Sequence, residues 1–73
     1  MRKLIVKIDE VNADLTFFNG FLLGIGAMVP FNEFSYFFSD DEIMVHARPA
    51  VLSRVKTFFS DYFRDDEMKE SEV

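Results

Sequence analysis

Apolar and polar residues alternate along three short segments of the chain, a pattern typical of half-buried β-strands. The first segment covers residues 3–8. The other two lie within residues 34–48, on either side of the polar run Ser39-Asp-Asp-Glu42. Asp and Ser favour turns because their side chains hydrogen-bond their own backbone, so residues 34–48 are predicted to form a β-hairpin.

Two other segments repeat apolar residues at spacings of three and four, which predicts helices with one apolar face. The first helix is expected over residues 12–28, with Asn12 or Asp14 as its cap. Pro30 ends it, because proline cannot donate the helical hydrogen bond. The second helix begins at Pro49, where the missing N–H costs nothing. The residues expected in the core include Leu22, Val45, Val55 and Phe59.

Three glycines, Gly20, Gly24 and Gly26, interrupt the first helical pattern. Each glycine costs about 0.5–1 kcal/mol relative to alanine inside a helix, so something must offset them. The favoured explanation is a close approach of this helix to the sheet, or fraying of its last turn. A docking groove along the small residues is the functional alternative. The sequence leaves open whether Leu15–Val29 is a fully regular helix.

The order strand-helix-strand-strand-helix predicts an α+β fold, a two-layer sandwich of a three-stranded antiparallel sheet with both helices on one face. Apolar periodicity stops at Arg64. We therefore expect one α+β domain over residues 1–63, followed by a flexible, disordered acidic tail over residues 64–73.

Aromatic residues are abundant for so short a chain, with ten Phe and two Tyr among 73 residues. A domain of this size buries only about 60% of the surface that its unfolded chain exposes. Some rings should therefore stay exposed and serve as partner contacts. The candidate partner-binding residues combine the expected open sheet face with one ring from a connector: Phe37, Met44, His46, Arg48, Ile5 and Phe31.

Composition argues against catalysis, cofactors and metal binding. The chain has no Cys, and its single His46 lacks the second ligand that zinc requires or a nucleophile to activate. The acidic run at residues 40–42 lacks the spacing of a calcium loop, and the glycines at residues 20–26 lack the Lys-Ser/Thr pair of a phosphate loop. We expect a binding protein and no enzyme.

The formal net charge is −5, and the chain shows no basic stripe of the kind that nucleic-acid binding uses. We therefore expect no direct nucleic-acid binding. The apolar stretch at residues 15–31 contains three Gly and ends beside Pro30, and it is shorter than the roughly 20 residues of a membrane span. We expect no membrane association either.

A Cys-free acidic domain of 73 residues that lacks a catalytic set and ends in Arg64-Asp-Asp-Glu-Met-Lys-Glu-Ser-Glu-Val73 resembles the small host-takeover proteins of bacteriophages. It is most similar to the phage regulators that bind bacterial RNA polymerase and inhibit transcription initiation. The resemblance implies a non-enzymatic inhibitor in the host bacterial cytoplasm, with polymerase subunits as partner. Two alternatives stay open: an anti-CRISPR or DNA-mimic inhibitor of a host nuclease, and a homo-oligomeric structural module.

Overall fold

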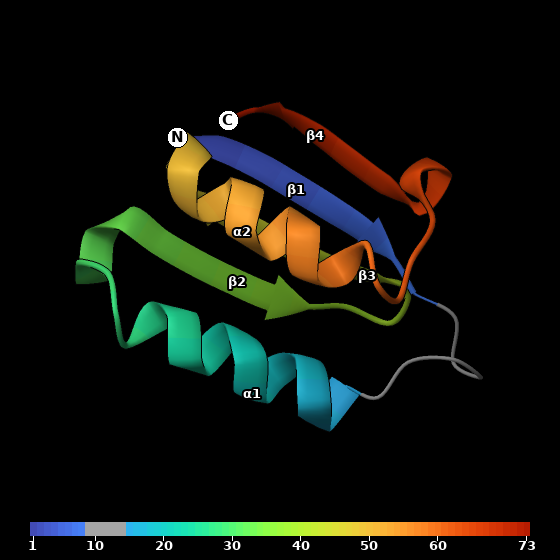
Figure 1. Cartoon of the computed structure of the whole chain (residues 1–73), viewed down its shortest axis with the longest axis horizontal. Helices are drawn as coiled ribbons and strands as arrows, with labels where there is room; N and C mark the ends of the chain where they lie inside the picture. The colour runs from blue at the N-terminus through green and yellow to red at the C-terminus, as the bar shows by residue number, and fades with distance from the viewer. Residues whose placement is uncertain (9–14) are drawn as a thin grey trace.

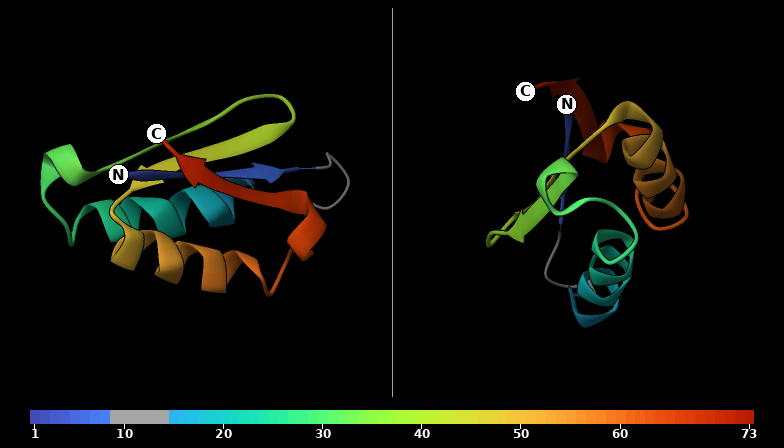
Figure 2. Two further views of the ribbon diagram at one scale, coloured as in Figure 1. Left: turned by 90° about the horizontal axis from the view of Figure 1, so that it is seen from above. Right: turned by 90° about the vertical axis from the view of Figure 1, so that its left-hand side faces the viewer.

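The chain folds into a four-stranded antiparallel sheet with two helices packed on one of its faces (Figures 1 and 2). The computed structural model describes residues 1–8 and 15–73, and of Phe31 the backbone alone. Its elements follow in the order β1 (Arg2–Lys7), α1 (Leu15–Gly26), η1 (Phe31–Glu33), β2 (Phe34–Phe38), β3 (Glu42–Ala47), α2 (Pro49–Phe59), η2 (Asp65–Glu67) and β4 (Met68–Glu72).

The strands lie in the order β2-β3-β1-β4, so β1 is an inner strand with antiparallel neighbours on both sides. Leu4 of β1 faces Val45 of β3 on one side and Glu70 of β4 on the other. This combination of element order and strand order is the split βαβ, or ferredoxin-like, arrangement. Many unrelated functions use that arrangement, so function has to be argued from the surface.

The α+β class and the two helices were predicted correctly, but the prediction of three strands was wrong. Residues 64–73 are no disordered tail, because they form η2 and then β4, which pairs with β1 along its whole length. Figure 1 shows this last strand beside β1 at the edge of the sheet. The fold therefore extends past Phe63, where the apolar periodicity ends.

This polar strand contacts the rest of the fold through one apolar side chain and through its carboxylates. Met68 buries its side chain in the core and is 8% exposed. Arg2, on the neighbouring strand, lies 3.8 Å from a carboxylate oxygen of Glu70 and 3.9 Å from one of Glu72. The two carboxylates that point to the helix side of β4 thus both lie within 4 Å of the same cation.

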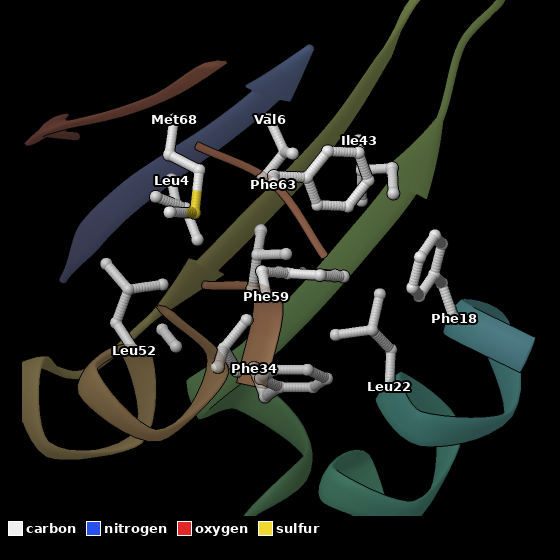
Figure 3. Packing of buried hydrophobic residues seen from close by; sticks show 13 residues of the cluster. Leu4, Val6, Phe18, Leu22, Phe34, Ile43, Leu52, Phe59, Phe63 and Met68 are labelled. Atoms are coloured by element: carbon white, nitrogen blue, oxygen red, sulfur yellow. The ribbon is translucent and has the colours of Figure 1, made fainter. Parts of the chain in front are cut away.

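The core lies between the sheet and the helices and is rich in phenylalanine (Figure 3). The four residues predicted to be buried, Leu22, Val45, Val55 and Phe59, are each fully buried. Phe18 of α1 contacts the ring of Phe59 of α2, with their centroids 5.4 Å apart in an edge-to-face arrangement. Such aromatic pairs are favourable beyond the area that they bury, so the rings bind α1 to α2.

Gly20 and Gly24 do not serve a close approach to the sheet, which corrects that part of the prediction for these two positions. A Cβ placed on Gly20 or Gly24 would meet no atom within 4 Å, so both positions face open space. Gly26 ends the helix, and a Cβ there would come within 3.4 Å of the ring of Phe34. The predicted caps, Asn12 and Asp14, lie outside the described residues.

Within the described ranges, neither helix has the length and the apolar character needed to cross a membrane.

Candidate functional site

No helix of the described residues lies on the face of the sheet opposite α1 and α2, and we call this face the open face (Figure 2). Because side chains alternate between the two faces of a strand, the burial of Leu4 and Val6 under the helices turns their neighbours to the open face. The continuous strand registers place these neighbours in rows that run across all four strands. The predicted side-chain alternation of β1, β2 and β3 is therefore correct.

The central row of the open face is apolar at three of its four positions. Ile5 of β1 faces Met44 of β3, and Met44 faces Phe37 of β2. Ile5 also faces Lys69 of β4, so the fourth position of the row is a charged residue. Phe37 is 56% exposed, whereas Ile5 and Met44 are half-buried. The row thus presents one accessible ring, Phe37, which is supported by the side chains of Ile5 and Met44. An exposed ring on an apolar support is typical of residues that anchor a protein partner.

The next row is polar and contains the only histidine. Lys3 of β1 faces His46 of β3, which faces Ser35 of β2. Among the described residues, the Nε2 atom of His46 is shielded from solvent and has no hydrogen-bond partner. An unpaired buried polar group costs roughly 1–3 kcal/mol, so a partner that reached this nitrogen with a hydrogen-bonding group would recover some of that cost.

A shallow hollow joins the two rows between β2 and β3. It has a volume of about 120 Å³ and is lined by Ser35, Tyr36, Phe37, Met44 and His46. A hollow of this size is far smaller than the roughly 300–1,000 Å³ of a small-molecule site. It can admit the tip of one side chain from a partner.

The open face carries more positive charge than the rest of this acidic chain. Lys3, Lys7 and Lys69 all project there, against the single carboxylate of Glu42 on the strands themselves. Toward η2 the balance changes, because a second hollow combines Lys7 and Lys69 with Glu42, Asp66 and Glu67. The excess of positive charge therefore lies around Lys3 and the apolar row.

The structure brings together four of the six residues predicted to contact a partner. Ile5, Phe37, Met44 and His46 share the open face, as described above. Arg48 lies between the end of β3 and the start of α2, and it pairs its Nε with an oxygen of Glu33 at 2.6 Å. Phe31 begins η1, and its side chain lies outside the described part of the chain.

Sequence reasoning missed Lys69 as a member of the open face. Its omission follows directly from the assignment of residues 64–73 to a disordered tail. The available signal was the alternation of Met68, Glu70 and Glu72 with Lys69 and Ser71, but an edge strand with a single apolar residue gives too weak a pattern to detect.

Among the Phe side chains that the structure describes, two are exposed. These are Phe37 and Phe17, which is 46% exposed on the helix layer. Phe21 is half-buried, and Phe63 is buried. The helix layer also exposes Leu23 and Tyr62, so apolar surface is present on both sides of the molecule. The open face differs because its apolar row lies among cations and beside an unpaired polar atom.

In the part of the chain that the structure describes, no three His, Cys, Asp or Glu side chains gather in a way that could hold a metal ion. In comparisons with protein-family models, curated proteins and solved structures, nothing matched this chain.

Proposed function

We propose that this protein is a non-enzymatic binding module that attaches to a protein complex through its open sheet face. The observation that carries the proposal is the row Ile5–Met44–Phe37, an apolar strip whose outer ring is 56% exposed. Large rings that stand on a supporting apolar surface supply much of the binding energy at protein interfaces.

Charge favours an acidic patch on the partner. Lys3 lies one row from the apolar strip, and Lys69 ends the strip on β4. Complementary charges around an apolar centre speed association and fix its orientation. The part of the open face around Ser35 and Phe37 carries no charged side chain. It can therefore be buried in an interface without the cost of removing a charge from water.

We further propose bacterial RNA polymerase as the partner and inhibition of transcription initiation as the result. This part rests on the resemblance to phage regulators, with the host bacterial cytoplasm as the compartment. The open face supports it only in that it suits a protein surface.

Single-stranded nucleic acid is a less suitable occupant of the same face. Base stacking on a four-stranded sheet uses rings on the accessible strands. Here the inner strands present Ile5 and Met44, and the only ring that the described residues place on the open face is Phe37, on an edge strand. The overall charge of −5 also opposes a phosphate backbone.

The deciding experiment is runoff transcription by a bacterial polymerase with wild-type protein, a Phe37→Ser variant and a Leu23→Ser variant. Leu23 is a matched control, because it is 58% exposed but lies on α1, on the other side of the molecule. We expect inhibition by the wild type and the control. An exposed anchor residue contributes about 2 kcal/mol to the binding free energy, so its loss raises the dissociation constant roughly thirtyfold. The Phe37→Ser variant should therefore inhibit only at a much higher concentration.

Two results would count against the proposal in different ways. Equal inhibition by wild type and Phe37→Ser would show that the open face is not the docking surface. Absence of inhibition by the wild type would remove polymerase as the partner, and affinity capture from a bacterial lysate would then show whether a nuclease complex takes its place.

A further inference from the structure

The two edges of the sheet differ sharply in how they are protected. An edge strand exposes unpaired backbone groups, and proteins usually guard it with charges, proline or a bulge. The β4 edge follows that rule, because Lys69, Glu70 and Glu72 occupy three of its five positions. The β2 edge has the sequence Phe-Ser-Tyr-Phe-Phe, with no charge and no proline. Its register with β3 is continuous, so it has no bulge either.

The backbone groups that β2 leaves free can be assigned residue by residue. The Ser39 N–H donates to the Glu42 carbonyl at 2.9 Å, which makes this pair a hydrogen-bonded pair of the hairpin. Hydrogen-bonded and non-hydrogen-bonded pairs alternate along an antiparallel ladder. Phe37 and Ser35 therefore direct their N–H and C=O groups to β3. Phe34, Tyr36 and Phe38 direct theirs away from the sheet.

We infer that β2 is the surface through which two copies of this chain associate, edge to edge and antiparallel, to form one continuous sheet. The strand is self-complementary, as a two-fold symmetric contact requires. With Tyr36 at the symmetry axis, it faces Tyr36 of the second copy, and Phe34 faces Phe38. All three residues with outward backbone groups then exchange N–H···O=C bonds with the second copy.

Charges at the ends of the strand are compatible with this register. Glu33 would face Ser39 of the second copy, and its carboxylate is already paired with Arg48. Asp40 would face Asn32, which is uncharged. No two like charges oppose each other across the contact. For a chain with a net charge of −5, the uncharged β2 edge is where two copies approach with least repulsion.

Side chains on both faces would gain contacts. On the helix side, Tyr36 and Phe38 are only partly buried in a single copy, and pairing would bring them against rings of the second copy. On the open face, Phe37 would face Ser35 of the second copy and lie diagonally from the other Phe37, within reach of an aromatic contact. This inference uses a different observation from the proposed function and does not depend on its partner.

Sedimentation equilibrium of the whole chain, over a wide range of protein concentrations, tests the association directly. We expect a monomer that converts to a dimer as concentration rises. Amide hydrogen exchange supplies the residue-level test. The N–H groups of Tyr36 and Phe38 should gain protection as the dimer forms, whereas the N–H of Phe37 should be protected at every concentration because it bonds to β3.

A charge-swap pair of variants tests the register. The double variant Ser35→Lys/Phe37→Lys should be monomeric, because each new cation would oppose another across the two-fold axis. The double variant Ser35→Glu/Phe37→Glu should be monomeric for the same reason. Mixing the two should restore a dimer that contains one copy of each. Ser71→Glu is the control, because it places a charge on the open face at the other edge and should leave the dimer intact.

A wild-type protein that stays monomeric at every concentration would overturn the inference and leave the proposed partner untouched. So would a dimer that persists unchanged in both double variants, since its contact would then lie elsewhere. Restoration of the dimer by mixing, together with protection of Tyr36 and Phe38, would establish the β2 contact and its antiparallel register.

Discussion

Phe21 of α1 and Phe58 of α2 stack face to face, with their ring centroids 3.6 Å apart and their planes within 6° of parallel. This contact lies at the seam between the two helices. Around it, Phe18 and Tyr62 meet Phe58 edge-on or tilted at larger separations. The helix layer is therefore held together by rings from both helices.

A double-mutant cycle on Phe21→Leu and Phe58→Leu should give a small coupling energy. Aromatic pairs contribute about 0.5–1.5 kcal/mol beyond area burial, and an almost eclipsed stack is less favourable than an offset or edge-to-face pair. We expect a coupling at or below the lower end of that range, measured by urea unfolding. A coupling clearly above the range would show that face-to-face stacking is a principal stabilising contact here.

Replacing Phe59 with Ala should severely destabilise the domain. Phe59 is fully buried and contacts the rings of Phe18 and Phe63. Large-to-small changes of this kind cost about 3–5 kcal/mol. A chain this short has little more stability than that in all, so thermal unfolding should begin near or below room temperature. Phe37→Ser, on the open face, should change the midpoint little by comparison.

Removing residues 64–73 should abolish cooperative folding or strongly lower the urea midpoint. The truncation deletes Met68 from the core and leaves β1 without one of its two neighbours. Met68→Ala in the full chain is the milder variant and should cost about 2–5 kcal/mol, at the lower end if the site collapses. Deleting Val73 alone, which is 68% exposed, should have no effect. An unchanged midpoint after the long truncation would contradict the role of β4.

Gly20→Ala and Gly24→Ala should each stabilise the protein. Both positions lie inside α1 and face open space, so a methyl group removes backbone entropy from the unfolded chain without a clash. We expect a gain of about 0.4–1 kcal/mol for each, seen as a higher thermal midpoint. Gly26→Ala should gain less, because it ends the helix and its methyl group would touch Phe34. Destabilisation by Gly20→Ala would mean that its surroundings are more crowded than they are in the structure.

The local pattern of apolar and polar residues was sufficient to identify β1, the β2–β3 hairpin and α2. Alternation in β1 and in the β2–β3 hairpin identified the strands and their faces, because each contributes apolar residues to the core at every second position. The same alternation placed Ile5, Phe37, Met44 and His46 on one surface. Periodicity also identified α2, whose buried residues Leu52, Val55 and Phe59 recur at helical spacing.

The local pattern missed β4, because this strand depends on contacts with residues far away in the sequence. Residues 68–72 pair with β1, which lies more than 60 residues earlier in the chain, and no window around residues 64–73 can reveal that pairing. Arg48 lies past the last residue of β3, and its guanidinium pairs with Glu33, the residue just before the preceding hairpin strand.

The inner position of β1 has a consequence for folding kinetics. Leu4 needs partners at Val45 and Glu70, so neither side of this strand can form before long loops have closed. Loop closure costs entropy before its contacts repay it, and chains with such distant pairings fold more slowly than those with local ones. Of the three strand pairings that the structure describes, only the β2–β3 hairpin joins residues that are close together in the sequence. We therefore expect it to be ordered early in the transition state, with β1 and β4 completing the sheet afterwards.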